Sequence, residues 1–257
     1  MTTDILKAVD LTKAYGSIAV LKSVGITMKR GETHAVIGPN GAGKTTLFKI
    51  LSGEVPADQG TIEISGRRVE HLDGFKRVRM GVGRTFQVAR VLNEVTVLEN
   101  MIVAIEAKQR QTGEISCLSL RINPSAHTLN AANAQLASMN LQEVSNVIAG
   151  SLAYGDRKRL ELSMSLALRP ELLMLDEPMA GMSPADRLAA VETIRDVVRK
   201  HSISVLLTEH DMDVVFALAD LVTVLNYGEV IASGSPEQVR ADPRVRDVYL
   251  GHEAQHA

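Results

Sequence analysis

The sequence contains little cysteine, few aromatic residues and almost no net charge. Its single cysteine, Cys117, excludes an internal disulfide and fits a reducing compartment. Aromatic residues make up 3% of the chain and tryptophan is absent, so few side chains can stack on the bases of a nucleic-acid strand. The formal net charge is −2. Neither the composition nor the charge therefore favours a nucleic-acid partner.

Long apolar runs are also missing. No stretch approaches the roughly 18 uninterrupted apolar residues of a membrane-spanning helix. The first ten residues, MTTDILKAVD, lack the basic start and apolar run of a signal peptide. We therefore expect that the chain does not cross a membrane by itself and that any membrane role comes through partners. At 257 residues it is long enough for one large or two small packed units.

Residues 38–46, GPNGAGKTT, fit the phosphate-binding pattern G-x-x-x-x-G-K-[ST]. The glycines let successive backbone N–H groups turn inward around an anion, Lys44 can reach the β- and γ-phosphates, and Thr45 offers an oxygen to Mg²⁺. The context fits as well, because residues 33–37 read as an apolar strand and residues 45–51 as a helix. A glycine-rich turn without a ligand is the alternative interpretation.

Three other runs have the pattern of strands in hairpins. Residues 5–9 and 20–28 read as strands joined by a turn, and residues 61–64 as part of another hairpin. They predict an antiparallel layer beside the nucleotide core. Tyr15 lies just before the second strand, where it either stacks on an adenine ring or serves the commoner purpose of packing.

The character of the chain changes after residue 87. A capping box at residues 96–99 predicts one helix, and Asn123-Pro124, as N-cap and first helical residue, predicts a second helix to about Met139. Residues 111–122 between them read as an exposed loop. Residues 88 to about 163 are thus predicted to form a mostly helical insert in an α/β chain.

Polar residues follow several apolar strands. Residues 172–175, LLML, are typical of a central parallel strand and end at Asp176-Glu177. Residues 203–207 repeat the pattern before His210, and residues 81–87 read as a strand that ends at Gln87. Open α/β sheets bind ligands at the carboxyl ends of their strands, so we expect these polar side chains to converge.

Each of these residues has a candidate role. Asp176 fits the acidic residue that holds Mg²⁺ through its water shell, and Glu177 is placed to orient and deprotonate the attacking water. Two solvated carboxylates that cap a strand are the alternative. His210 is a candidate contact for the γ-phosphate only through its place at a strand end, since a single histidine is usually structural.

A second anion site is predicted at residues 151–156, which precede a helix to about Leu168. Arg157, Lys158 and Arg159 lie in the first turn of this helix, where positive charge opposes the helix dipole. We interpret them as a solvated face. A phosphate brought to the same end of the helix is the alternative reason for their presence.

Together these motifs resemble those of the ATP-binding subunits of ABC transporters, in the same order over essentially the whole chain. The matching motifs are the phosphate loop, Gln87, the signature LAYGD, Asp176-Glu177 and His210. We expect an α/β fold with a phosphate-loop NTPase core of mostly parallel sheet, an antiparallel β subdomain and a helical insert. The core and β subdomain take residues 1–87 and 164–235, the insert residues 88–163, and a helical tail residues 236–257.

The resemblance implies an ATPase in which two subunits sandwich two ATP molecules, each signature segment completing the site of the other copy. It also assigns roles to residues. Those expected to bind ATP are Tyr15, Gly38, Pro39, Asn40, Gly41, Ala42, Gly43, Lys44, Thr45 and Thr46, with Leu152, Ala153, Tyr154, Gly155 and Asp156 of the signature. Those expected to hold Mg²⁺ are Thr45, Gln87 and Asp176, and the catalytic residues are Glu177, His210 and Gln87.

The sequence departs from the family pattern in two places. Ala153-Tyr154 stands where the family signature has Ser-Gly, so a serine contact to the γ-phosphate is missing and backbone amides and Gly155 must replace it. Residues 179–183, which follow Glu177 and correspond to the D-loop of the family, lack the common aspartate. This leaves the contacts of that segment across the dimer open.

Four segments, GRTFQ, LAYGD, DEPMAGMSP and VRDVYLG, resemble more closely the ATPases of branched-chain amino acid importers. This implies transmembrane permease subunits as partners, an indirect link to a substrate-binding protein, and a position on the cytoplasmic face of the inner membrane. An ATPase for lipid or lipopolysaccharide transport is the alternative, because such ATPases share the short insert and a similar ending.

A soluble ABC protein that acts on ribosomes or DNA is a further alternative. Only a set of basic residues favours it, and we interpret them as a solvated or partner-facing surface: Arg67, Arg68, Lys76, Arg77, Arg79, Arg84 and Arg90. In the tail, Val239, Val245, Val248 and Leu250 recur among charges. We expect this apolar face to pack against the chain's own core rather than a partner.

Overall fold

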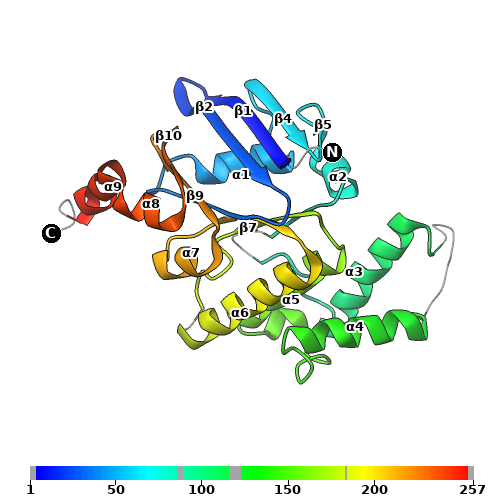
Figure 1. Ribbon diagram of the computed structural model, residues 1–257. Coiled ribbons are helices and arrows are strands. Elements are labelled where there is room, and N and C mark those ends of the chain that lie inside the picture. Colours follow the sequence, from blue (N-terminus) through cyan, green and yellow to red (C-terminus); the bar gives the residue numbers. More distant parts are fainter. Residues whose placement is uncertain (1–3, 86–88, 116–122, 183, 254–257) are drawn as a thin grey trace.

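The protein is described by a computed structural model that covers residues 4–85, 89–115, 123–182 and 184–253. In this part of the chain two sheets lie one above the other, with helices α3 and α4 to one side (Figure 1). The upper sheet is antiparallel, with strand order β2-β1-β4-β5, and the lower is mostly parallel, with order β10-β9-β3-β8-β7-β6. The predicted α/β class, with an antiparallel layer and helices beyond a mostly parallel sheet, is confirmed.

The strands have the following bounds: β1 Asp4–Tyr15, β2 Ile18–Lys29, β3 Thr33–Ile37, β4 Gln59–Ile64, β5 Arg67–Arg68, β6 Val82–Arg84, β7 Leu172–Asp176, β8 Ser204–Thr208, β9 Leu221–Asn226 and β10 Glu229–Gly234. The helices are α1 Lys44–Ser52, α2 Gly74–Arg79, α3 Val97–Thr112, α4 Ala126–Ser138, the 3₁₀ turn Ala149–Ser151, α5 Tyr154–Ala167, α6 Pro184–His201, α7 Met212–Leu218, α8 Pro236–Ala241 and α9 Pro243–Glu253.

The central strands of the lower sheet are covered on both faces. Every residue of β3, β7 and β8 is buried, and β6, β7, β8, β3 and β9 run parallel. Alternate residues therefore enter two cores. Val36 joins the core that contains α1 and the antiparallel sheet, whereas Ala35 and Ile37 join the core formed with α3 to α7. Helix α1 is thus held between the two sheets, with its N-terminus at the end of β3.

Local signals set most helix ends. Thr96 and Glu99 form the predicted capping box of α3, and Gly53 ends α1 in the left-handed conformation. The predicted N-cap of the second insert helix is wrong. Ser125 is the N-cap of α4, because its hydroxyl accepts the Thr128 N–H at 3.1 Å, two residues beyond Asn123.

Other boundaries also differ from the predictions. Strand β1 continues to Tyr15 through irregular pairing with β2, and α3 continues through residues 111 and 112, which the sequence placed in a loop. The strand predicted over 81–87 is β6, Val82–Arg84. In the tail, Val239 and Val245 are buried in the core formed with α3 to α7, so the expected packing of this segment on the chain itself is confirmed for them.

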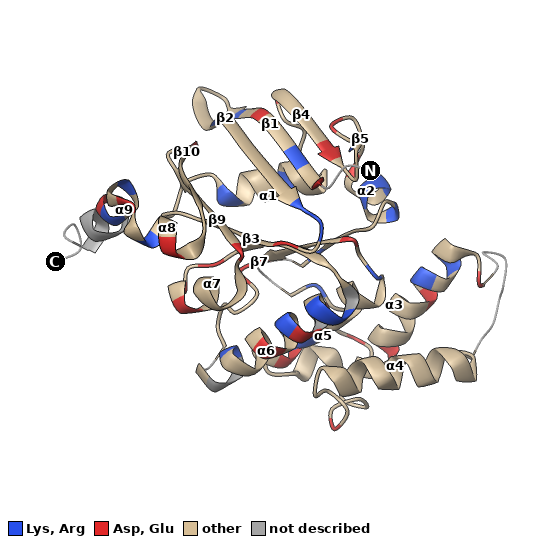
Figure 2. Ribbon diagram, in the orientation of Figure 1, with Lys and Arg blue, Asp and Glu red and all other residues tan. Residues whose placement is uncertain are grey.

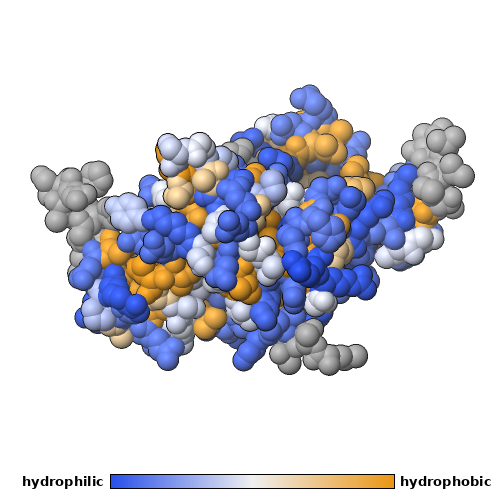
Figure 3. Space-filling model, turned by 90° about the horizontal axis from the view of Figure 1, so that it is seen from above, coloured by the Kyte–Doolittle hydropathy of each residue, from blue (hydrophilic) through white to orange (hydrophobic). Residues whose placement is uncertain are grey.

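The surface is mixed in polarity. Seen from above, hydrophobic residues form several separate areas among hydrophilic ones (Figure 3). Among the described residues, no helix combines the length and the apolarity that crossing a bilayer requires.

One buried cation fastens α1 to α2. Arg77 is 2% exposed, and its guanidinium donates to the carbonyls of Ile50 and Leu51 in the last turn of α1 at 2.7 and 2.8 Å. It also donates to the carbonyls of Val69 and Leu72. The last carbonyls of a helix have no partner within the helix and carry its negative end, so a buried guanidinium satisfies and stabilises them. The interpretation of Arg77 as part of a solvated basic surface is therefore wrong.

We predict that Arg77→Met lowers the free energy of unfolding by about 3 kcal/mol or more, because it removes four hydrogen bonds to backbone carbonyls. The carbonyls of Ile50 and Val69 keep a second donor, in the N–H groups of Gly53 and Leu72, whereas those of Leu51 and Leu72 lose the guanidinium without such a replacement. Arg79→Met is the matched control, since Arg79 is exposed on the same helix. Its effect is expected within about 0.5 kcal/mol. Urea denaturation of the two variants measures the difference. Equal destabilisation of both would contradict the assigned role of Arg77.

Candidate nucleotide site

The phosphate loop connects the buried strand β3 to the N-terminus of α1. Gly38 and Gly43 have positive φ, and a Cβ on Gly38 would lie 2.1 Å from the carbonyl oxygen of Leu225. A Cβ on Gly43 would lie 2.7 Å from Leu21 Cδ2 and 2.9 Å from the Val20 carbonyl. Glycine is therefore required at both positions for the loop to pass the neighbouring strands. The free N–H groups at the start of α1 lie at the end of this loop.

Lys44 folds back over the loop. Its Nζ donates to the carbonyls of Gly38 at 2.6 Å and Pro39 at 3.1 Å, and the residue is 7% exposed. Burial lowers the pKa of Lys44, while the charges of Glu177 and Asp176 oppose this change. The ammonium thus lies in the loop and faces the acidic residues at the end of β7. Phosphate oxygens are stronger hydrogen-bond acceptors than the two carbonyls that it contacts here.

Asp176 is fixed by two neighbours. Its Oδ1 accepts the hydroxyl of Thr208, at the end of β8, at 2.9 Å, and its Oδ2 lies 3.3 Å from Arg84 Nη2. Arg84 also donates to the Ser52 hydroxyl, in the last residue of α1, at 2.6 Å. Arg84, the last residue of β6, therefore connects the end of α1 to Asp176 at the end of β7. The prediction that Arg84 belongs to a solvated or partner-facing surface is therefore wrong, since its side chain is 8% exposed.

Glu177 and His210 meet beyond the ends of β7 and β8. His210 Nε2 lies 2.7 Å from Glu177 Oε1, in a geometry in which the imidazole N–H donates to the carboxylate. Glu177 has φ of +48°, and its N–H donates to the carbonyl and hydroxyl oxygens of Thr208 at 3.1 Å each. The strained backbone turns this carboxylate away from the strand direction of Asp176. The predicted convergence of Asp176, Glu177 and His210 is observed.

Glu209 also belongs to this site, although it was not among the predicted site residues. It is 5% exposed, and its carboxylate accepts the N–H groups of Met179 at 2.9 Å and His210 at 3.2 Å. Burial raises the pKa of Glu209 and backbone hydrogen bonds oppose this. Its carboxylate thus joins the segment after Glu177 to the segment that carries His210. The only signal in the sequence is its place one residue after β8.

One predicted nucleotide contact, Tyr15, lies on the antiparallel sheet. Tyr15 is at the end of β1, 48% exposed, with Lys13 Nζ 5.6 Å from its ring centroid. Its hairpin partner β2 packs against Gly43, so the ring stands on the sheet that flanks the phosphate loop. Gln87 lies outside the described residues.

The signature segment forms the start of α5, with Tyr154 as its first residue. Arg157 and Arg159 are half-buried, and Arg159 contacts Asp156. The prediction that all three basic residues form a solvated face is wrong for Lys158, which is 4% exposed and lies 3.9 Å from Glu161 Oε2. Figure 2 shows the basic residues of α5 beside acidic ones. Lys158 is buried because its helix face packs on the core, where Glu161 balances its charge.

The donor set around the loop suits Mg²⁺. Thr45 is an exposed hydroxyl in the first turn of α1, and Asp176 supplies carboxylate oxygens held by Thr208 and Arg84. Such hard oxygen donors fit Mg²⁺, which keeps several waters and takes few protein ligands beside phosphate oxygens. Among the described residues, no group of three or more His, Cys, Asp or Glu side chains could bind a metal by itself.

The fold and this loop define a phosphate-loop nucleotide-binding protein of the α/β class. A family model described as "ABC transporter" matches residues 21–180, and one described as "Branched-chain amino acid ATP-binding cassette transporter" matches residues 229–255. The chain therefore belongs to the ABC transporter family, as an ATP-binding subunit.

Similar proteins match nearly end to end. The high-affinity branched-chain amino acid transport ATP-binding protein LivG of Escherichia coli K12 is 39% identical, with 98% of this chain and 99% of LivG covered. The corresponding BraF protein of Pseudomonas aeruginosa is 37% identical over the same shares, and the lipopolysaccharide export ATP-binding protein LptB of Haemophilus influenzae is 31% identical over 97% and 98%. A solved structure, the ADP conformation of the ATP-binding cassette MJ1267, has a TM-score of 0.83 at 28% identity, covering 97% of this chain and 100% of MJ1267.

Proposed function

We propose that the protein binds and hydrolyses ATP to power a membrane permease that imports branched-chain or related amino acids. The observation that carries the proposal is the meeting of Lys44, Asp176, Glu177 and His210 at the carboxyl ends of parallel strands, where phosphate-binding sheets hold their ligands. The similarity to LivG and BraF over nearly the whole chain supports the substrate class.

Each residue has a separate role in the proposed reaction. Lys44 and the N–H groups at the start of α1 hold the β- and γ-phosphates and balance their charge. Thr45 and Asp176, with Gln87, would hold Mg²⁺, which neutralises charge on the phosphate oxygens. Glu177 orients the attacking water and accepts its proton, and His210 positions that carboxylate through the 2.7 Å contact.

One copy of the chain supplies only part of this site. The signature segment Leu152–Asp156 is proposed to complete the phosphate site of a second copy. Dimeric arrangements are known for the fold, since the ADP- and phosphate-bound cassette MJ0796 was solved as a dimer and has a TM-score of 0.78 at 21% identity. The proposed place of the assembly is the cytoplasmic face of the inner membrane, bound to permease subunits.

The lipid or lipopolysaccharide alternative remains a second candidate through the similarity to LptB. Two observations favour the amino acid importer. LivG and BraF are more similar to this chain, and residues 229–255 match the branched-chain amino acid family model. Those residues include β10, α8 and the described part of α9.

We predict that Glu177→Gln keeps ATP affinity but lowers kcat by about 100-fold or more, because general-base help is worth about 10²- to 10⁴-fold. The matched control is Glu192→Gln, a change of the same chemistry at an exposed position of α6. Phosphate release and binding of a fluorescent ATP analogue measure the two properties. Hydrolysis by Glu177→Gln near the wild-type rate would exclude Glu177 as the base.

The composite site predicts a dependence on protein concentration. ATP turnover per subunit should fall as the purified protein is diluted, because a monomer holds ATP without a signature segment opposite the phosphates. A dilution series with ATP held constant tests this. Turnover that stays constant per subunit far below any detectable dimer would contradict the composite site.

The partner chemistry is tested by affinity purification from the native membrane. We expect permease subunits to co-purify, and ATPase activity of the reconstituted complex to rise with a binding protein loaded with leucine, isoleucine or valine. Stimulation by lipid or lipopolysaccharide instead would favour the second candidate.

A further inference from the structure

We propose that Tyr154 is a positioning residue that ties the signature segment to the turn carrying Glu177 in the same copy of the chain. The inference rests on the proposed ATPase function and deepens it. It concerns one of the two signature positions at which this sequence departs from the family pattern. There, a ring replaces the glycine, and the structure places that ring against residues 177–182, named here the acidic turn.

The contact is between the Tyr154 ring and the backbone of Gly181. A Cβ built on Gly181 would lie 3.1 Å from both Cδ1 and Cε1 of Tyr154, which is tighter than ordinary van der Waals contact, and Gly181 has φ of +72°. The next pair of residues is also close, because a Cβ built on Gly155 would lie 4.0 Å from Met182 Cγ. The first two residues of α5 therefore rest on the last two described residues of the acidic turn.

The acidic turn is held as a unit by its own hydrogen bonds. The Ala180 N–H donates to the Glu177 carbonyl at 3.2 Å, and the Met182 N–H donates to the Met179 carbonyl at 3.2 Å. The Met179 N–H donates to Glu209, and the Glu177 N–H to Thr208. Because these hydrogen bonds hold residues 177–182 together, a displacement of Gly181 also moves Glu177.

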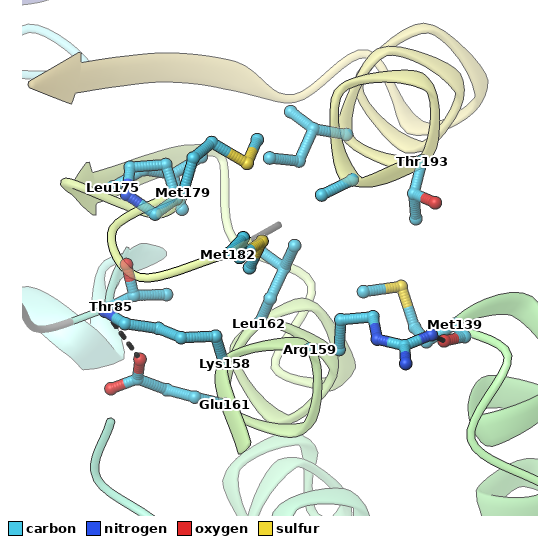
Figure 4. A pocket seen from close by; sticks show the side chains of 13 residues that line it. Thr85, Met139, Lys158, Arg159, Glu161, Leu162, Leu175, Met179, Met182 and Thr193 are labelled. Atoms are coloured by element: carbon cyan, nitrogen blue, oxygen red, sulfur yellow. Dashed lines mark hydrogen bonds and ion pairs between the residues drawn. The ribbon is translucent and has the colours of Figure 1, made fainter. Parts of the chain in front are cut away.

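Side-chain packing joins the same two elements further along α5. Met179, Met182 and Leu162 line one apolar pocket between α5, α6 and the end of β7 (Figure 4). Thr85 lines this pocket beside Lys158 and Glu161, whose ion pair is drawn there. The acidic turn is thus seated on α5 both at its first turn, through Tyr154, and along its buried face.

The Tyr154 hydroxyl stays neutral in this setting. Burial raises its pKa, and the charges of Glu161 and Glu177 raise it further, with Arg157 opposing them. Tyr154 therefore acts through the shape of its ring and not through charge.

This placement links two ATP sites. In the proposed dimer the signature segment of one copy faces the nucleotide of its partner, whereas Glu177 serves the nucleotide bound by its own loop. When the partner's ATP draws the signature segment inward, the Tyr154 ring presses on Gly181 and sets the position of Glu177. Hydrolysis in one site then depends on closure of the other.

The first test compares Tyr154→Ala with Tyr154→Phe in the full-length chain. Tyr154→Ala should leave the KM for ATP within about twofold, lower kcat about tenfold and reduce the Hill coefficient for ATP from near 2 towards 1. Tyr154→Phe, which keeps the ring, should restore the Hill coefficient. Phe75→Ala, an exposed aromatic on α2, is the matched control and should change none of these values.

A kcat and Hill coefficient of Tyr154→Ala equal to those of the wild type would overturn the inference. So would a parallel loss of kcat and ATP affinity, because that indicates general disruption of the site. If the wild type itself does not hydrolyse ATP, the proposed function fails instead. The two failures are therefore distinguished by the wild-type measurement.

Gly181→Ala supplies a double-mutant cycle, since its new Cβ would lie 3.1 Å from the ring and press on it. If the two residues act through their contact, the combined variant should lose little more activity than the worse of the single variants. Fold-losses that multiply independently would contradict a direct coupling.

The last measurement separates a contact within one copy from a contact with the partner's nucleotide. In the Glu177→Gln background, ATP should drive dimer formation on size-exclusion chromatography. Adding Tyr154→Ala should preserve this dimer if the ring acts on its own acidic turn. Loss of the ATP-driven dimer would show that the ring is needed at the partner's phosphates and would overturn the proposal.

Discussion

Burial of the central parallel strands on both faces is the constraint on which the rest of the structure depends. β3, β7 and β8 have no solvent-facing side, so a bound ligand can reach their side chains only where these strands end. The phosphate loop, Asp176-Glu177 and Glu209-His210 follow at those ends. Parallel pairing brings them to a single edge of the sheet. There the charges of Asp176 and Glu177 oppose the lowering of the Lys44 pKa by burial.

Three cations buried behind this edge show how the site is kept in place. Arg77 holds the last turn of α1, Arg84 joins that helix end to Asp176, and Lys158 pairs with Glu161 inside α5. Breaking any of these pairs is expected to lower the stability of the fold strongly, because removing one partner leaves a buried charge uncompensated. Helix α1, which follows the phosphate loop, is therefore fixed at both ends. At its N-terminus the glycines let the loop pass close to neighbouring strands, and at its C-terminus Arg77 and Arg84 bind its last residues.

The sequence predicted those features of the fold whose signals lie within a few neighbouring residues. The glycine positions of the phosphate loop, the capping box of α3 and the apolar run of β7 act within a few residues, and they are found where they were predicted. The N-cap predicted at Asn123 was wrong, because Ser125 two residues later can accept an N–H equally well and is the N-cap in the structure. Basic residues were misread wherever the helix face or strand face that buries them depended on distant packing.

The sequence by itself determined that the chain holds nucleotide phosphates on a loop between a strand and a helix, because the residues required are contiguous. It also determined that acidic residues follow the buried strands. Only the tertiary structure decided which oxygen of Asp176 meets Thr208 or Arg84, that Glu209 joins two loops, and that the Tyr154 ring rests on Gly181. These contacts join residues from different elements, and their geometry follows from how sheets and helices pack rather than from any local pattern.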